Sequence, residues 1–133
     1  MSLKIGVWKM NQNGVEATLN INVLDPETGV VSLASPVFAQ QPGAGQAALG
    51  LWDETSRTIS FWGPLTVEHG APRSPRFYKG FLFSTPATPT PGQDVVWTLA
   101  GFVQVLDLGA AQEMGGNARR NVFGWFAQIT EVG

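Results

Sequence analysis

Glycine and proline divide this chain at short intervals, and their spacing is the strongest constraint on its fold. The sequence holds 16 glycines and 9 prolines in 133 residues. Between them, no stretch with the 3.6-residue repeat of an amphipathic helix persists, and Ala110–Met114 could form one helical turn at most. The intervening segments are instead typical of β-strands bounded by turns.

The clearest strand runs from Glu16 to Leu24, where apolar and polar residues alternate with the period of two that one buried face requires. Its apolar members are Ala17, Leu19, Ile21 and Val23, and its polar members are Thr18, Asn20 and Asn22. The segment Asp25–Gly29 follows as a hairpin turn, because proline presets φ and glycine permits a positive φ.

Eight segments in succession have this character, with connections that are mostly of hairpin length. We expect strands at Ile5–Lys9, Glu16–Leu24, Gly29–Ala34, Gln46–Trp52, Arg57–Trp62, Arg76–Ser84, Asp94–Asp107 and Asn121–Glu131. Such spacing favours a sandwich or an up-and-down barrel, and closure removes the exposed edges of apolar strands. The sequence therefore predicts an all-β fold, an eight-stranded antiparallel up-and-down β-barrel, as a single domain over residues 1–133.

The later strands are apolar on both faces. In the segment from Val95 to Val105, Trp97 and Leu99 lie on one face, while Ala100 and Phe102 lie on the other. A barrel strand with one face in water should be polar on that face. We therefore expect a homo-oligomer, a dimer or a tetramer, that covers the outer wall. The alternative is a larger sandwich core within one chain.

Composition narrows the classes of partner. The net charge is -2, and charged residues make up 14% of the chain, so neither nucleic acid nor a membrane is expected. The absence of cysteine excludes a disulfide framework, a thiol nucleophile and a thiolate metal site. We expect a cytoplasmic protein from the sequence as written, or a secreted one if a leader has been removed.

Catalytic signals are weak, and we expect no enzyme and no cofactor. His69 is the only histidine and lies in a polar loop, so no multi-histidine metal site can form. Ser56, Ser60 and Ser74 lie outside any nucleophile-elbow pattern. The glycine pair before Asn117 lacks the Lys-Ser/Thr of a phosphate loop.

Several local patterns, in this order along the chain, resemble the avidin–streptavidin family. They are Gly6-Val-Trp8-Lys-Met-Asn11-Gln-Asn-Gly14, Ile59-Ser-Phe-Trp62, Tyr78-Lys-Gly80-Phe-Leu-Phe83, and the pair Trp97-Thr-Leu99 and Asn121-Val-Phe123. The first pattern has one more residue between its tryptophan and its asparagine than the family has. The resemblance spans most of the chain and implies a barrel that binds a small ligand.

The resemblance implies an aromatic box formed by Trp62, Tyr78 and Trp97 around the apolar part of the ligand. It also implies that Asn11 donates to a ureido oxygen and that Asn121 accepts from a ring nitrogen. The alternatives are ordinary core aromatics for the box, and turn chemistry at strand ends for the two asparagines.

Other positions depart from the biotin-binding pattern. Val15 stands where the family has a serine, and the tyrosine expected on the third strand falls near Ser35. The polar partners near Tyr78 become Ser74 and Arg76. Each missing hydrogen bond to a buried polar group costs about 1–3 kcal/mol, so we expect a ligand other than biotin.

Arg76 suggests a different ligand chemistry. A guanidinium that points into the barrel needs an acidic partner, which a carboxylate-bearing or otherwise anionic ligand would supply. The alternative places Arg76 in water at the mouth of the barrel, beside Arg73.

A protein-interaction barrel, inhibitor-like or lectin-like, is the other function that the sequence allows. Its long loops, Gly63–Pro75 and Thr85–Gln93, would then present the binding surface. The interior distinguishes the two functions. Aromatic rings around a cavity would favour a ligand, and an interlocked interior would favour the loops or the outer wall.

Overall fold

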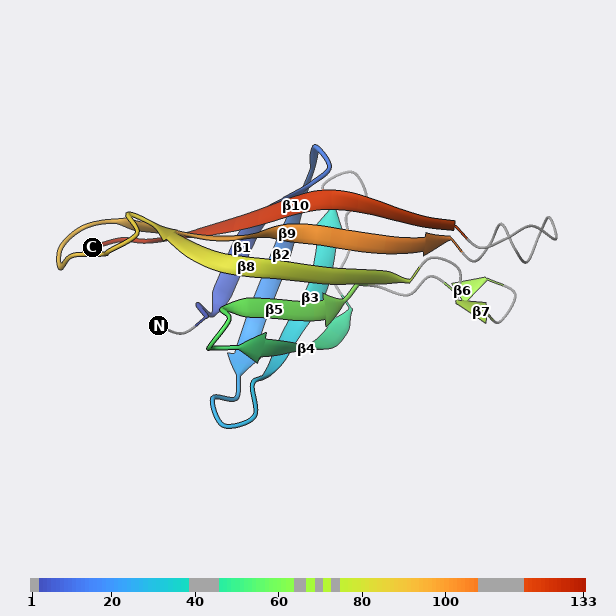
Figure 1. The fold of residues 1–133 in the computed structure, drawn as a ribbon, viewed down its shortest axis with the longest axis horizontal. Coiled ribbons are helices and arrows are strands. Elements are labelled where there is room, and N and C mark those ends of the chain that lie inside the picture. The colour runs from blue at the N-terminus through green and yellow to red at the C-terminus, as the bar shows by residue number, and fades with distance from the viewer. Residues whose placement is uncertain (1–2, 39–45, 64–66, 69–70, 73–74, 108–118) are drawn as a thin grey trace.

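The computed structural model describes residues 3–38, 46–63, 67–68, 71–72, 75–107 and 119–133. Eight strands form a closed antiparallel barrel in the order β1-β10-β9-β8-β5-β4-β3-β2 (Figure 1). The barrel strands are β1 (Gly6–Gln12), β2 (Val15–Leu24), β3 (Val30–Phe38), β4 (Ala47–Asp53), β5 (Thr58–Trp62), β8 (Arg76–Thr85), β9 (Val95–Asp107) and β10 (Arg119–Glu131). This architecture confirms the expected fold class.

Two short strands were not expected. β6 (Val67–Glu68) and β7 (Ala71–Pro72) form a separate two-stranded ribbon within the segment predicted to be an irregular loop. The possible helical turn at 110–114 lies outside the described residues. No helix long and apolar enough to cross a membrane occurs in the described part of the chain.

The first strand continues past its expected end at Lys9, because the turn lies further along the chain. Asn13 and Gly14 have φ values of 49° and 86°, as the two-residue turns of tight hairpins require. β1 therefore pairs with β2 as far as Gln12, which lies opposite Val15. This extension brings Gln12 into the barrel wall.

The predicted turn between β2 and β3 is confirmed. The amide of Gly29 donates to the carbonyl of Asp25 at 2.8 Å, and φ of Gly29 is 77°. The carboxylate of Asp25 also accepts a hydrogen bond from the amide of Glu27 at 2.9 Å. A β-carbon on Gly29 would lie 2.5 Å from the carbonyl oxygen of Trp52, so the turn also needs glycine for space.

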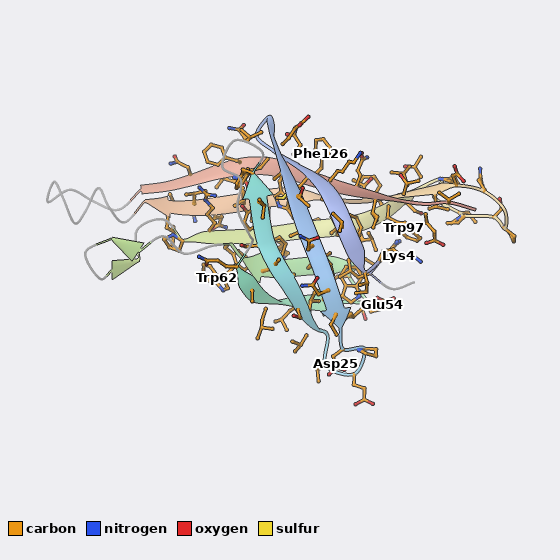
Figure 2. The ribbon with its side chains drawn as sticks, turned by 180° about the vertical axis from the view of Figure 1, so that it is seen from behind. Lys4, Asp25, Glu54, Trp62, Trp97 and Phe126 are labelled. Atoms are coloured by element: carbon orange, nitrogen blue, oxygen red, sulfur yellow. The ribbon has the colours of Figure 1, made fainter. Side chains whose placement is uncertain are left out.

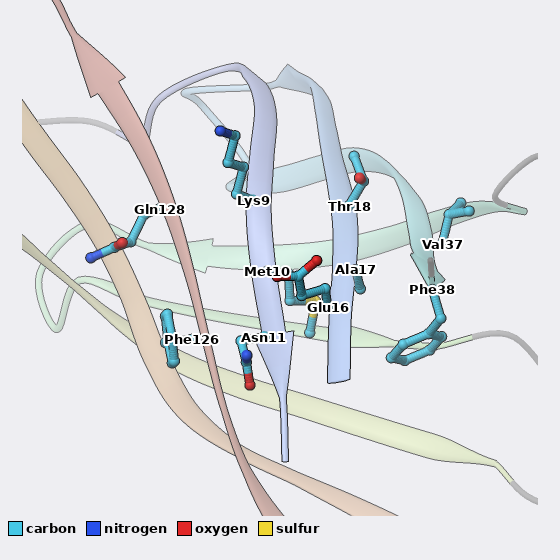
Figure 3. A pocket seen from close by; sticks show the side chains of 10 residues that line it. All are labelled: Lys9, Met10, Asn11, Glu16, Ala17, Thr18, Val37, Phe38, Phe126 and Gln128. Atoms are coloured by element: carbon cyan, nitrogen blue, oxygen red, sulfur yellow. The ribbon is translucent and has the colours of Figure 1, made fainter. Parts of the chain in front are cut away.

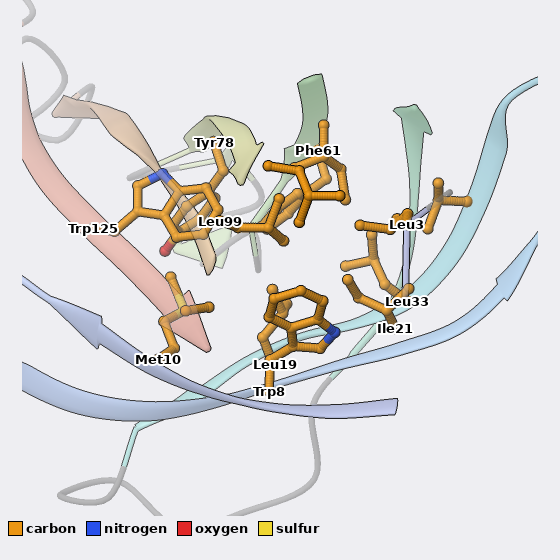
Figure 4. Packing of buried hydrophobic residues seen from close by; sticks show 14 of the residues in the cluster. Leu3, Trp8, Met10, Leu19, Ile21, Leu33, Phe61, Tyr78, Leu99 and Trp125 are labelled. Carbon is orange, nitrogen blue, oxygen red and sulfur yellow. The ribbon is translucent and has the colours of Figure 1, made fainter. Parts of the chain in front are cut away.

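The core fills the barrel with large side chains from many strands (Figure 4). Those with almost no exposed surface include Trp8, Leu19, Ile21, Leu33, Ile59, Phe61, Tyr78, Leu99 and Val103. Alternation places them inside and their chain neighbours outside: in β8, Tyr78 and Leu82 are buried whereas Phe81 and Phe83 are exposed. The outer wall therefore keeps apolar residues in contact with solvent.

Candidate ligand-binding site

A stacked aromatic cluster lies inside the barrel around Tyr78. Its ring is fully buried and stacks on Phe61, with centroids 4.8 Å apart and an interplanar angle of 8°. Trp125 packs edge-on against both rings, at 6.0 Å from Phe61 and 5.9 Å from Tyr78. These residues come from β8, β5 and β10, and they point toward one another across the interior (Figure 4).

A polar pair adjoins this aromatic cluster. The hydroxyl of Tyr78 donates a hydrogen bond to Oε1 of Gln12 at 2.5 Å. Gln12 faces inward because it follows Trp8 and Met10 at intervals of two along β1. Gln12 was not identified as a site residue from the sequence. Its position four residues after Trp8, and therefore on the same face of the strand, was the available signal.

Arg76 stands on the same face of β8 as Tyr78 and is half-buried. Its Cζ lies 5.7 Å from the centroid of the Phe38 ring, which is close enough for a cation–π interaction. Burial raises the pKa of the Tyr78 phenol, and the positive charge of Arg76 opposes that rise. The guanidinium is therefore an electrostatic neighbour of the buried hydroxyl rather than a surface group remote from it.

Gly63 leaves room for this arrangement. Its amide donates to the carbonyl of Arg76 at 2.8 Å, which ties the end of β5 to the start of β8. A β-carbon on Gly63 would lie 2.8 Å from Cε1 of Tyr78 and 3.2 Å from Cβ of Arg76. The Tyr78 ring can lie where it does because residue 63 has no side chain. We refer below to Gln12, Phe38, Phe61, Arg76, Tyr78 and Trp125 as the Tyr78 cluster.

The expected box of Trp62, Tyr78 and Trp97 does not form. Trp62 follows the inward-facing Phe61, so its ring lies on the outer wall, 52% exposed, beside Phe77. Trp97 points inward but lies far along β9 from Tyr78, because Trp97 pairs with Ser84 whereas Tyr78 pairs with Val103. Figure 2 shows Trp62 and Trp97 well apart on the molecule.

Trp97 belongs instead to a polar contact near the chain ends. Its indole nitrogen donates to Glu131 at 3.3 Å, and the amino group of Lys4 lies 5.2 Å from its ring centroid. Lys4 and Glu131 form an ion pair at 2.7 Å. These contacts join the segment before β1 to the end of β10.

The two asparagines occupy positions other than those that the resemblance implied. Asn11 lies on the outer face of β1, and its side-chain oxygen accepts a hydrogen bond from the amide of Gly14 at 2.9 Å, which is turn chemistry. Asn121 pairs with Val105 near one end of β10 and is exposed. Ser74 lies outside the described residues.

On the third strand, Ser35 stands near the position where the resemblance implies a tyrosine. Ser35 is buried, and its hydroxyl accepts a hydrogen bond from the amide of Gln46 at 2.9 Å. This bond helps to join the end of β3 to the residue before β4.

An open depression lies on the outer wall across β10, β1, β2 and β3, with a volume of about 650 Å³ (Figure 3). Polar and charged side chains line much of it: Lys9, Asn11, Glu16, Thr18 and Gln128. Phe126 adds an exposed aromatic ring. In the part of the chain that the structure describes, no group of three or more histidine or acidic side chains could hold a metal ion.

A closed up-and-down barrel of eight antiparallel strands is an architecture typical of small-ligand-binding barrels. Two solved structures share this architecture. Apo shwanavidin matches with a TM-score of 0.58 at 17% identity, and a low-affinity mutant of shwanavidin matches with a TM-score of 0.61 at 16% identity. Each match covers 97% of this chain and 98% of the other.

The similarity is visible in three dimensions and not in the sequence comparisons. No protein-family model matches the chain, and no curated protein matches it. The structural matches establish an avidin-like fold, in agreement with the resemblance carried by the local patterns. At this level of identity the fold alone is transferred, and the ligand has to be argued from the Tyr78 cluster.

Proposed function

We propose that this barrel binds a small ligand, other than biotin, at the Tyr78 cluster and performs no catalysis. The observation that carries this proposal is the meeting of Gln12, Arg76 and Tyr78 over buried aromatic rings. An apolar surface with a few convergent polar groups is the usual composition of a small-molecule site. Support also comes from the avidin-like fold, although fold by itself does not determine function.

The polar groups support a ligand other than biotin. Asn11 lies on the outer wall, and Val15 has no hydroxyl to donate. The hydroxyl of Ser35 is already bonded to the amide of Gln46. A ureido group would therefore lack the partners that the resemblance implies at these three positions, which costs about 1–3 kcal/mol for each bond that no other donor makes.

The interior is interlocked around Tyr78, which is the arrangement expected for the protein-interaction alternative, and any ligand is therefore restricted to the edge of the cluster. Tyr78 and Trp125 are 0% and 3% exposed, so their rings already fill the middle of the barrel. Phe38 and Arg76 are only half-buried. We therefore place the ligand against Phe38, Gln12 and Arg76, with Tyr78 beneath.

Thermal unfolding and tryptophan fluorescence test this proposal. Biotin and a panel of small carboxylates and ureas are each added in excess to the wild-type protein and to a Gln12→Leu variant. We expect a panel compound, and not biotin, to raise the melting temperature of the wild type, because a ligand that binds only the native state stabilises it. Gln12→Leu should remove that response, whereas Val132→Ala, at the exposed chain end, should keep it.

Two results would contradict the proposal. Stabilisation by biotin would show that other groups replace the missing donors. No response to any compound would show that the barrel has no small-ligand site at this position.

A second function, protein interaction through the outer wall, has its own observation. Trp62 and Phe77 stand side by side outside the barrel, with ring centroids 5.2 Å apart. Leu49 and Leu51 line an adjoining apolar depression with them. An inhibitor-like or lectin-like role would use such a surface or the loops. This role would be favoured if none of the small compounds changed the melting temperature.

A further inference from the structure

We infer that the ligand of the Tyr78 cluster carries a carboxylate and that Arg76 binds it. This inference rests on the small-ligand site proposed above and specifies the chemistry of its ligand. It depends on the charge of Arg76, the orientation of Gln12 and the apolar surface beside them.

Arg76 is a half-buried cation whose described neighbours do not neutralise it. Its contacts are the ring of Phe38 and the neutral phenol of Tyr78. Glu131 pairs with Lys4, and no described carboxylate pairs with Arg76. A partly desolvated guanidinium is best satisfied by an anion, which it can bind through two parallel hydrogen bonds.

Gln12 adds donors of the same kind. Its side-chain oxygen accepts a hydrogen bond from the hydroxyl of Tyr78, so the acceptor end of the amide is occupied. The other end carries two N–H donors, and no described residue accepts from them. Burial raises the pKa of Tyr78, so the phenol stays protonated at neutral pH and keeps Gln12 in this orientation.

Beside Tyr78, the cluster therefore presents hydrogen-bond donors from Gln12 and Arg76 and the positive charge of Arg76. A carboxylate has only acceptors and one negative charge, so it complements both. A urea or a primary amide can also accept through its carbonyl oxygen, but it carries no negative charge, and its own N–H groups find no acceptor on the Arg76 guanidinium. The charge of Arg76 thus favours a carboxylate over a neutral carbonyl group.

The neighbouring rings define the rest of the ligand. Phe38 lies under the guanidinium, and Phe61 and Trp125 flank Tyr78. Of these rings only Phe38 is half-buried rather than buried, and its apolar surface favours an apolar or aromatic body attached to the acid. The inferred ligand class is a small organic monoacid without the ureido ring that biotin carries in addition to its own carboxylate.

Calorimetric titration of the wild-type protein with two matched probes tests the inference. The probes are 3-phenylpropanoate and 3-phenylpropanamide, which share their size and ring and differ in charge. We expect the acid to bind at least about tenfold more tightly, as a charge-assisted hydrogen bond provides. Addition of the acid should also shift the Arg76 Nε–H resonance in a nitrogen-15 NMR spectrum.

The variant Arg76→Gln should weaken the acid about tenfold and leave the amide unchanged. Lys79→Gln is the matched control, because it removes the same charge from the outward face of the same strand. This control should leave both affinities as they are. If Arg76→Gln does not fold, the comparison of acid with amide on the wild type still decides the question.

Equal affinity for the two probes, or tighter binding of the amide, would overturn the carboxylate inference while the proposed site stands. Binding of a neutral urea with no binding of the acid would do the same. If neither probe nor any compound of the wider panel binds, both the inference and the proposed function are wrong.

Discussion

At the scale of single residues, the face on which a side chain lies decides its role. Asn11 resembles a biotin-binding asparagine in sequence, but it stands an odd number of positions after the inward-facing Trp8. Side chains of a strand alternate between faces, so Asn11 points outward and Gln12 points into the barrel. The one extra residue between Trp8 and Asn11, compared with the family pattern, therefore turns the asparagine outward. The amide that faces the interior is that of Gln12, one position further along β1.

Another residue-scale effect is electrostatic and can be tested by pH. The hydrogen bond and the charge of Lys4 lower the pKa of Glu131 below its usual range, and the indole of Trp97 contributes. Because the native pKa is the lower one, the pair stabilises the fold at neutral pH, and this contribution is lost as pH falls through that pKa. We expect carbon-13 NMR titration to give a low midpoint for Glu131, which Lys4→Met raises. Identical midpoints in the two proteins would contradict the assigned cause.

At the scale of elements, a close contact between β8, β9 and β10 depends on glycine. Gly80 of β8 pairs with Gly101 of β9. The indole of Trp125 from β10 lies over this pair, and a β-carbon on Gly80 would lie 2.7 Å from its Cζ2. The absence of a side chain at Gly80 is therefore what allows Trp125 to reach Tyr78 and Phe61.

Gly80→Ala should destabilise the barrel by about 1–3 kcal/mol, the usual cost of overpacking a filled core. Gly124→Ala is the control, since Gly124 is an exposed strand glycine whose β-carbon would meet no atom within 4 Å. That substitution should change the unfolding free energy by less than about 0.5 kcal/mol. Urea unfolding of both variants measures the difference. Equal effects would show that Trp125 does not occupy the space over Gly80.

At the scale of the whole molecule, the outer wall is more apolar than an isolated barrel requires. Large hydrophobic side chains that are exposed there include Val7, Leu49, Leu51, Trp62, Phe81, Phe83, Val122 and Phe126. Contiguous exposed apolar surface of this kind marks a site of association. We propose that a second copy of the chain covers the part around Trp62, as the two-sided apolar strands predicted.

Sedimentation velocity tests this association. The wild type should sediment as a dimer or a tetramer, and Trp62→Glu should shift it to a smaller species, because a charge buried without a partner is strongly unfavourable. Val132→Glu adds the same charge at the exposed C-terminal end, away from β5, and should keep the wild-type assembly. A monomeric wild type at micromolar concentration would contradict the proposal.

The sequence alone determined the eight barrel strands apart from their ends, the hairpin at Asp25–Gly29 and which residues of β9 share a face, since glycine, proline and a period of two act within a few residues. Only the tertiary structure decided which aromatic residues meet. Tyr78 stacks on Phe61 and contacts Trp125. Trp97 lies about 20 Å along β9 from Val103, the residue that pairs with Tyr78, at roughly 3.3 Å per residue. The stagger between strands sets these meetings, and it arises from closure of the whole barrel rather than from any one segment.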